Sequence, residues 1–392
     1  MPRKLSIAVI AACPFPYPRG TPVRIHRSSE ALARAGADVE VVTYHLGQTD
    51  VDTPFRVSRI RPIATYRRVD PGPSCQKLLL VDPLLVGLFR RVLAEHRFDV
   101  IHAHHYEGLL VALASRPQQP IIYDAHTMLE SEIDYYSPRL LRGTSRIIGR
   151  QIDRWLPRKA DHIIAVTDKI KQRLIAGGSA RADDITVIPN GVDMEPFLGV
   201  EHADWGDGAT IVFAGNMASY QGIELLLQAL KQVLDVRPEA RLLVVSNSSF
   251  APYENLAAAL AIRDRIDIVD ADFAELPRLL AQSDVAVSPR SECDGLPQKL
   301  LNYMAAGLPT VSFEGSAATL KHDVTGLLVE NDNIAAFAQS ICRLLSDRVS
   351  ARRLGQEARA VARVEYSWDA GAEKALALYD GILLRNKMYR RL

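Results

Sequence analysis

The chain has 392 residues, of which 48% are hydrophobic and 24% charged, and its formal net charge is +1. This length is more than one small core organises and favours two domains of similar size. A net charge near zero provides no overall field that would select nucleic acid as a partner. The four cysteines lie far apart, with no C-x-x-C pair and no metal-ligand spacing, so they predict neither a disulfide framework nor a structural metal.

The apolar segments are too short or too interrupted to predict a signal peptide or a transmembrane helix. Residues 6–12 are apolar, but they read as a first buried strand. The longest apolar stretch elsewhere, Leu78–Leu93, is broken by Asp82, Arg90 and Arg91. Together with the cysteine usage, this favours a reducing, cytoplasmic setting.

Short β-rich runs alternate with helical patterns along the chain, and this alternation predicts βαβ units around parallel sheets. The first series of strand candidates is Ile7–Ala11, Val39–Thr43, Val100–Ala103, Ile121–Asp124 and Ile163–Val166, with helical patterns at Arg24–Ala35 and Gln76–Glu95. The second series is Thr210–Ala214, Arg241–Ser246, Ile266–Val269, Asp284–Ser288, Thr310–Phe313 and Gly326–Val329.

Two features divide these series into domains. Met194–Asp207 is polar and lacks periodicity, which is typical of a linker. A last helical pattern, Ser367–Leu384, follows the second sheet, and we expect it to cross back onto the first domain. The predicted fold class is α/β, with two doubly wound parallel-sheet domains facing a central cleft. Their bounds are 1–193 and 194–366, and the terminal helix occupies 367–392.

One segment, Ser288–Gly307, brings an acidic residue, a glycine turn and a predicted helix start to the carboxyl end of a strand. In open α/β sheets ligands bind at such strand ends. The free N–H groups of a first helical turn suit a phosphate or a sugar phosphate. By itself the local pattern also fits an ordinary strand-turn-helix connection.

Six segments in order resemble retaining glycosyltransferase family 4, the large group with the two-Rossmann GT-B fold. They are Pro14–Pro22, Leu32–Thr43, Ala160–Thr167, Ile185–Asp193, Phe213–Leu227 and Asp294–Asn302. The last falls on the family signature of two glutamates separated by seven residues. The resemblance covers nearly the whole chain and implies the GT-B fold, with two Rossmann-like domains.

The implied activity is that of a hexosyl-type glycosyltransferase, which moves a sugar from a nucleotide-diphosphate sugar to a hydroxyl with retention of the anomeric configuration. The resemblance implies no cofactor beyond this co-substrate. The acceptor would be a glycolipid, a polysaccharide precursor or a small metabolite. In the mechanism commonly proposed, the departing diphosphate takes the acceptor's proton, so the protein mainly positions both substrates and stabilises negative charge.

In the first domain, the resemblance implies that Gly20 and Thr21 face the diphosphate and the acceptor. A glycine lets backbone N–H groups approach an anion closely, although a plain turn glycine is the alternative. Arg24 could reach the same anion or lie on a solvated helix face. His126 resembles the family histidine that hydrogen-bonds the donor sugar, and we predict a catalytic role for it over that of a core histidine.

In the second domain, Asp294 takes the first glutamate position and is predicted to accept hydrogen bonds from sugar hydroxyls, with Glu292 as a substitute. Asn302 takes the second position, where its amide could bind the ribose without a charge. The residues that would lend backbone N–H groups or shape are Gly295, Leu296 and Pro297. Because proline has no N–H, Pro297 would contribute shape alone.

Two departures from the family concern the diphosphate. Asn216 and Gln221 occupy positions where the family commonly has an arginine and a lysine. We predict that both still line the donor site, and that Arg290 and Lys299 replace the missing cations. The alternative is that these two side chains are ordinary surface charges, which contribute little.

Two patterns could suggest a metal. His102, His104 and His105 follow a predicted strand, but no acidic or cysteine cluster in the sequence completes a coordination set. Asp270–Asp272 spells the D-x-D pattern of metal-dependent glycosyltransferases, which is short and common by chance. Since the GT-B fold needs no divalent ion at the phosphates, we predict no metal site.

A basic, amphipathic segment, Ser137–Pro157, ends near Trp155 and could bind an anionic membrane surface. The basic tail Arg385–Leu392 is a second candidate. A core-packed helix with solvated arginines and a frayed tail is the alternative. We therefore expect a cytoplasmic protein that is either free or peripheral to the inner face of the membrane.

The sequence also fits other kinds of GT-B protein. A GT-B epimerase or phosphorylase would share the fold, although no motif marks the lysine that a pyridoxal cofactor would need. A catalytically silent GT-B protein that binds nucleotide sugar or a partner transferase is the main alternative, because Asn216, Gln221 and Asn302 depart from the family pattern.

Overall fold

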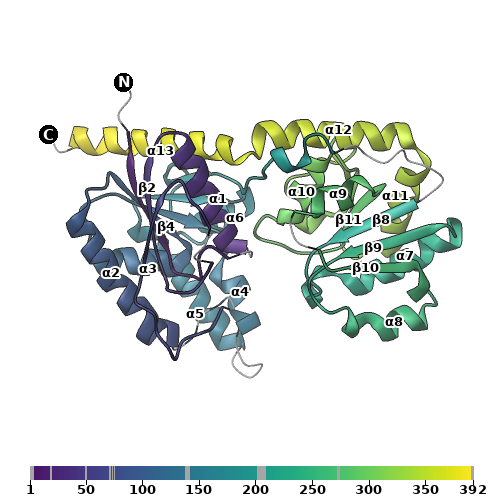
Figure 1. Ribbon diagram of the computed structural model, residues 1–392, viewed down its shortest axis with the longest axis horizontal. Coiled ribbons are helices and arrows are strands. Elements are labelled where there is room, and N and C mark those ends of the chain that lie inside the picture. Colours follow the sequence, from purple (N-terminus) through teal and green to yellow (C-terminus); the bar gives the residue numbers. More distant parts are fainter. Residues whose placement is uncertain are drawn as a thin grey trace. The chain divides into compact units, whose positions relative to one another are not determined.

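The computed structural model describes residues 4–17, 20–48, 51–69, 72, 74, 76–136, 142–200, 209–271 and 274–389, without the side chains of 134–136, 142 and 387–389. The chain forms two compact units (Figure 1). The first comprises Met1–Gly191 together with Trp368–Leu392, and the second comprises Val192–Ser367.

The first unit is built on a seven-stranded parallel sheet in the order β3-β2-β1-β4-β5-β6-β7. Its strands are β1 (Ser6–Ala11), β2 (Asp38–Thr43), β3 (Arg56–Arg59), β4 (Val100–His104), β5 (Ile121–Ala125), β6 (His162–Ala165) and β7 (Ile185–Val187). Central strands such as β4 and β5 are buried along their whole length, as expected for apolar runs covered on both faces. The predictions omitted β3 and β7 because these edge strands are short, and β3 carries two arginines rather than an apolar run.

Helices cover both faces of this sheet. They are α1 (Gly20–Arg34), the π-helical turn Lys77–Val81, α2 (Asp82–Glu95), α3 (His105–Ser115), α4 (Leu129–Tyr136), α5 (Arg142–Trp155) and α6 (Asp168–Ala176). The terminal helix α13 (Trp368–Tyr389) packs against α1 (Figure 1). Its buried residues recur every three or four positions and join the core with β1 and α1: Trp368, Ala372, Ala375, Tyr379 and Ile382.

The second unit has a six-stranded parallel sheet in the order β10-β9-β8-β11-β12-β13. Its strands are β8 (Ala209–Ala214), β9 (Ala240–Val245), β10 (Ile266–Val269), β11 (Val285–Ser288), β12 (Thr310–Phe313) and β13 (Leu327–Val329). The longer helices around it are α7 (Ile223–Val236), α8 (Glu254–Ala259), α9 (Leu276–Ala281), α10 (Gln298–Ala306), α11 (Ile334–Ser346) and α12 (Arg348–Glu365). All six predicted strands are present, with bounds that shift by one residue at most.

The segment predicted as a linker is packed at its start. Glu195–Phe197 forms a 3-10 turn, and Phe197, only 3% exposed, joins the core of the second unit with Val192. The polar composition of the segment did not indicate that it packs into a core, because one aromatic side chain is enough to fix a short segment.

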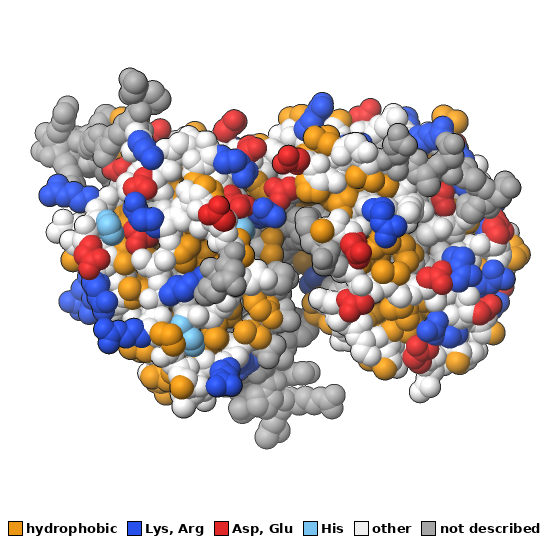
Figure 2. Space-filling model, viewed as in Figure 1, with side chains coloured by type: hydrophobic (Ala, Val, Ile, Leu, Met, Phe, Trp, Pro, Cys, Tyr) orange, Lys and Arg blue, Asp and Glu red, His pale blue; other side chains and the backbone are white. Residues whose placement is uncertain are grey.

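Strand order fixes where a site can form. In the first sheet β1 lies between β2 and β4, and in the second β8 lies between β9 and β11. The connections therefore leave in opposite directions at these strands, and ligands bind beside their carboxyl ends in such sheets. On the face that Figure 2 shows, basic and acidic side chains are mixed over both units. None of the described helices is long and apolar enough to span a bilayer.

Candidate active site

A cluster of buried polar side chains lies at the carboxyl ends of β4 and β5 in the first unit. Asp124 on β5 is 1% exposed and binds the guanidinium of Arg24, which α1 supplies. Nη2 of Arg24 lies 2.9 Å from Oδ2 and 3.1 Å from Oδ1 of Asp124, and Nε lies 3.1 Å from Oδ2. Arg24 thus neither faces solvent nor is left to bind an external anion, as the sequence had suggested. Its charge is matched inside the unit.

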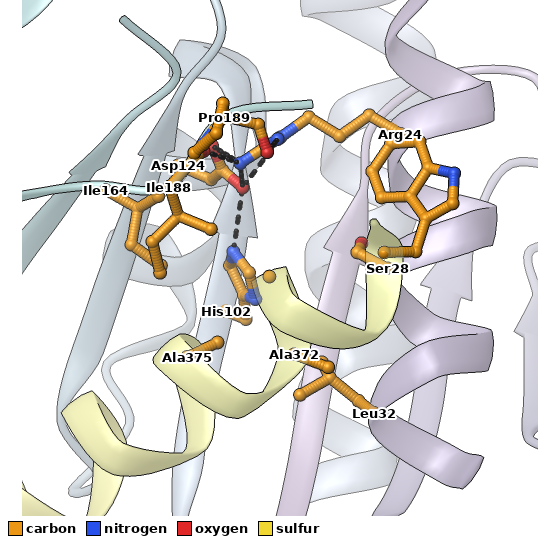
Figure 3. Close-up of a pocket in the computed structure, with 12 residues that line it drawn as sticks. Arg24, Ser28, Leu32, His102, Asp124, Ile164, Ile188, Pro189, Ala372 and Ala375 are labelled. Atoms are coloured by element: carbon orange, nitrogen blue, oxygen red, sulfur yellow. Dashed lines mark hydrogen bonds and ion pairs between the residues drawn. The ribbon is translucent and has the colours of Figure 1, made fainter. Parts of the chain in front are cut away.

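Figure 3 shows this ion pair beside a small pocket between α1, α13 and the sheet. Much of the lining is apolar: Leu32, Ile164, Ile188, Ala372 and Ala375. Burial alone would raise the pKa of Asp124, but the Arg24 guanidinium and the hydrogen bond with His102 hold this pKa well below its usual value. The carboxylate therefore stays ionised in an apolar setting.

Two histidines of β4 flank Asp124. Nε2 of His102 lies 3.1 Å from Oδ2 of Asp124, and its Nδ1 lies 2.7 Å from the hydroxyl of Tyr379 on α13. Nδ1 of His104 lies 3.0 Å from Nε2 of His126, which follows β5 directly. The terminal helix thus contributes a side chain to the polar centre of the first unit.

His126, predicted to contact the donor sugar, has both ring nitrogens engaged. Besides the contact with His104, its Nδ1 lies 3.2 Å from Oγ1 of Thr21, the second residue of α1. Burial lowers the pKa of His126 to about 3 and that of His104 well below its ordinary value. Both rings are therefore neutral near pH 7. Gly20 opens α1 and is exposed, while Thr21 is half-buried.

Potential metal ligands also meet here. Donor atoms of His102, His104 and Asp124 lie within 4.8 Å of one another. No acidic partner for these histidines was recognised in the sequence, because Asp124 comes from the neighbouring strand. However, the Arg24 guanidinium already engages both oxygens of Asp124, so it supplies the positive charge that a metal ion would bring. The side chains fit an ion-pair network better than a cation site.

The second unit places Lys299 at the carboxyl end of β8. Its Nζ donates to Oε1 of Gln221 at 2.6 Å and lies 4.0 Å from the ring centroid of Phe213. A Cβ added to Gly215 would stand 3.2 Å from this Nζ, so a residue without a side chain leaves room for the ammonium. Nε2 of Gln221 in turn donates to Oδ1 of Asn216 at 3.3 Å.

This arrangement brings together residues that the sequence analysis had singled out separately. The two uncharged residues at the family's cation positions, Asn216 and Gln221, form one hydrogen-bonded group with Lys299. Burial, followed by repulsion from Arg290, lowers the pKa of Lys299 to about 7. Lys299 is partly buried as a residue, but its ammonium is enclosed by the Phe213 ring and the Gln221 amide. It is therefore not an ordinary surface charge.

Arg290 makes contacts outside the group formed by Asn216, Gln221 and Lys299. Its guanidinium carbon lies 4.7 Å from the ring centroid of Tyr220, and its Nε donates to the backbone oxygen of Glu292 at 2.6 Å. The positive charge of Arg290 helps to lower the pKa of Lys299, while its Nε is used in the hydrogen bond to Glu292.

The signature segment leads into α10. Pro297 is the residue before its first turn and is buried, as is Leu296, while Asp294 and Gly295 are half-buried. Asn302, 6% exposed, has an Oδ1 with no hydrogen-bond partner among the described residues. A buried acceptor without a partner is uncommon and costs free energy, so this atom is suited to a ligand's hydroxyl.

The D-x-D pattern starts away from both groups. Asp270 is exposed and follows β10, an edge strand that β9 and β8 separate from β11. Asp272 lies outside the described residues.

Comparison with known proteins identifies the family. Residues 18–196 match the model of Glycosyltransferase Family 4, and residues 208–347 match that of Glycosyl transferases group 1. The chain belongs to glycosyltransferase family 4. Because members of this family transfer sugars, the chain is a glycosyltransferase, as the signature segments predicted.

Relatives that match most of this chain agree with the family assignment. The family 4 chain is 28% identical to a D-inositol 3-phosphate glycosyltransferase of Xylanimonas cellulosilytica, over 92% of this chain and 91% of that one. It is 27% identical to a sulfoquinovosyl transferase of Arabidopsis thaliana, over 99% of this chain and 74% of that one.

Solved structures share the fold of this glycosyltransferase. A sucrose-phosphate synthase from Thermosynechococcus elongatus superimposes with a TM-score of 0.82 at 22% identity, covering 97% of this chain and all of that one. HepE of Anabaena, in complex with UDP and glucose, gives a TM-score of 0.71 at 17% identity, covering 96% of this chain and 99% of that one. The predicted GT-B fold is confirmed.

Proposed function

We propose that this glycosyltransferase moves a sugar from a nucleoside-diphosphate sugar to a hydroxyl acceptor, with retention and without a metal ion. The single observation that carries the proposal is the ammonium of Lys299, which lies against Gly215 and Gln221 at the carboxyl end of β8. A cation there, close to the start of α10, suits the diphosphate of the donor.

The chemistry needs a stabilised leaving group more than a protein base. As the glycosidic bond to the diphosphate breaks, negative charge grows on the phosphate oxygens, and preorganised donors lower the barrier by binding that charge. Lys299, in the first turn of α10, would supply such a donor. Oδ1 of Asn302 would accept a hydrogen bond from a ribose hydroxyl, which keeps ribose binding without the family's carboxylate.

Retention fits the neutral state of His126. In a front-face reaction the departing phosphate oxygen takes the acceptor's proton, so no side chain has to act as a base. His126, with its pKa lowered to about 3 by burial and both nitrogens engaged, is poorly suited to be one.

The direct test is a screen of UDP-, GDP-, ADP- and CMP-sugars against the purified chain. The matching donor is expected to raise the melting temperature as its occupancy grows. UDP-glucose is the first donor to try, because HepE was solved with UDP and glucose. Transfer or slow donor hydrolysis should persist in EDTA, and NMR of the product should show the donor's anomeric configuration.

Two outcomes would contradict parts of this proposal. Loss of activity in EDTA that Mg²⁺ or Mn²⁺ restores would overturn metal independence. Binding without any transfer or hydrolysis would support the alternative of a silent nucleotide-sugar-binding protein, which the uncharged Asn216, Gln221 and Asn302 make a real competitor.

We further propose that α5 binds an anionic membrane surface, which would bring the enzyme to a lipid-linked acceptor. Two isoleucines of this helix, Ile147 and Ile148, are 61% and 51% exposed, and Trp155 is 57% exposed. Three exposed arginines share the helix: Arg146, Arg154 and Arg150, the last of which pairs with Glu130. The apolar side is therefore not wholly used for core packing, which favours a surface role. Residues 137–141 of the predicted segment lie outside the described residues.

Co-sedimentation with vesicles tests this membrane proposal. The protein is expected to bind vesicles rich in phosphatidylglycerol, but not pure phosphatidylcholine, and to be released as salt screens the arginines. Ile147→Ser with Ile148→Ser should weaken binding by about tenfold, given about 1 to 2 kcal/mol for lost apolar burial. Val349→Ser, at a residue 81% exposed in the second unit, is the matched control. No binding to the anionic vesicles would end this proposal.

A further inference from the structure

A chain of three side chains runs from the interior of the first unit to the start of α1. Nδ1 of His104 meets Nε2 of His126 at 3.0 Å, and Nδ1 of His126 meets Oγ1 of Thr21 at 3.2 Å. His104 is 1% exposed and His126 is 6% exposed, whereas Thr21 is half-buried. This series of hydrogen-bonded side chains therefore begins in the core and ends at Thr21, which solvent or a ligand can reach.

Asp124 determines which nitrogens carry protons. Its Oδ2 lies 3.4 Å from Nδ1 of His104. Its Oδ1 lies farther, 3.7 Å, from Nε2 of His126, so the carboxylate favours a protonated Nδ1 on His104, where a lone pair would be repelled more strongly. Nε2 of His104 has no partner among the described residues, and a buried acceptor without a partner is better tolerated than a buried N–H without one. Both considerations assign the proton of His104 to Nδ1.

The position of the proton on His104 determines the position of the proton on His126. Nδ1–H of His104 donates to Nε2 of His126, so the neutral ring of His126 carries its proton on Nδ1. That N–H donates to Oγ1 of Thr21. The hydroxyl oxygen is then an acceptor within the chain, and its own hydrogen is left to donate outward.

Thr21 is placed to use that hydrogen. It is the second residue of α1, where backbone N–H groups have no partner within the helix. Pro22, which follows, has no N–H to offer. The side-chain hydroxyl is thus a donor in a turn where one backbone donor is missing.

We propose that the Thr21 hydroxyl is the group through which this chain of histidines binds substrate, donating a hydrogen bond to an oxygen of the sugar substrate, and that His126 is a positioning residue that orients this hydroxyl. The proposal rests on the glycosyltransferase function above. It changes the role assigned to His126 by the family resemblance, from a direct contact with the sugar to a contact through Thr21.

The tautomer can be measured without any activity. Long-range ¹⁵N–¹H spectra of the wild-type protein labelled at histidine should show His126 neutral, with its proton on Nδ1, at pH 7. The His126 signals are assigned with His126→Asn. A proton on Nε2, or a charged ring, overturns the proposal even if no donor has been found.

Kinetics test the coupling between the two residues. Thr21→Val should lower kcat/KM by about 10- to 50-fold, the loss expected for one substrate hydrogen bond, while Thr21→Ser should stay within about threefold. His126→Leu should cost about 10-fold in the wild type but less than about threefold in the Thr21→Val background. His126→Asn, whose amide nitrogen can occupy the place of Nδ1, should recover most of the loss.

The kinetics of the double variant distinguish a direct contact of His126 with the substrate from a contact through Thr21. If His126→Leu costs the same factor with and without Thr21, then His126 contacts the substrate directly and the proposal is wrong. Melting temperatures of all variants separate misfolding from lost orientation, because a variant that melts well above the assay temperature is folded when its kinetics are measured. If the wild-type protein transfers no sugar, the function proposed above fails, and the NMR measurement alone decides the tautomer.

Discussion

Replacing Lys299 by alanine is expected to lower kcat/KM for sugar transfer by at least about 100-fold, the range seen when one charge-stabilising donor is removed. The ammonium lies beside Gly215 and Gln221, where the family's own cations are missing. Its loss would leave Arg290, which already binds the backbone of Glu292, as the remaining cation of this group. Steady-state kinetics and nucleotide-sugar affinity measure the effect.

A matched control separates the site from bulk charge. Lys231, 43% exposed and paired with Asp235 on α7, is an ordinary surface lysine. Lys231→Ala should change kcat/KM by less than about twofold. Unchanged turnover in both Lys299→Ala and Arg290→Ala would show that neither residue neutralises the diphosphate.

The same lysine predicts a pH dependence. With a pKa lowered to about 7 by burial and by Arg290, Lys299 is protonated in the free protein only below that pH. An anionic diphosphate binds the ammonium form, so binding takes up a proton above pH 7. Affinity for the sugar nucleotide should be highest below pH 7 and fall by up to about tenfold per unit above it. A sugar nucleotide is the right probe, because its diphosphate does not titrate in this range.

Calorimetric titrations between pH 6 and 9 would check this dependence. Lys299→Ala should bind weakly at every pH, with a flat profile. A flat profile in the wild-type protein would contradict the combination of a lowered Lys299 pKa and a contact between Lys299 and the diphosphate.

Replacing Arg24 by methionine is expected to lower the free energy of unfolding by about 3 to 5 kcal/mol. The change leaves the carboxylate of Asp124 buried without its cation. It also removes donors from the backbone oxygens of Ile188 and Pro189, which follow β7. Urea unfolding followed by tryptophan fluorescence measures the loss, since Trp368 is buried in the same unit.

Arg34 on the same helix provides the comparison. It pairs with Asp369, but the two side chains are 50% and 68% exposed, so Arg34→Met should cost less than about 1 kcal/mol. Adding Asp124→Leu to Arg24→Met should recover much of the stability, because no unpaired charge remains. Equal midpoints for Arg24→Met and Arg34→Met would contradict the role given to the buried pair.

The sequence was sufficient for the fold because the information it needed was local. Apolar runs such as Ile121–Asp124 are followed by turns and helical patterns, and this alternation already predicts parallel sheets. The edge strands β3 and β7 were missed because an edge strand needs little apolar sequence, so nothing distinguishes it from a loop. The linker prediction ran past Phe197 because only packing shows that this ring enters a core.

The sequence predicted individual residues of the candidate site but not the contacts between them. Motifs placed Thr21, His126 and Lys299 near strand ends, and the missing cations drew attention to Lys299. The histidines of β4 gave no acidic partner, because Asp124 comes from β5. Arg24 gave no sign that it is buried, since an arginine on an amphipathic helix most often lies on the solvated face.

The amino-acid order alone therefore determined the class, the family and the strand ends that carry the chemistry. The tertiary structure decided the pairings: Arg24 with Asp124 across 100 residues, Tyr379 with His102 across 277, and Lys299 with Gln221 across 78. Periodicity and motif spacing record neighbours along the chain. Charges, tautomers and pKa values depend on which groups meet in space, and folding alone brings those groups together.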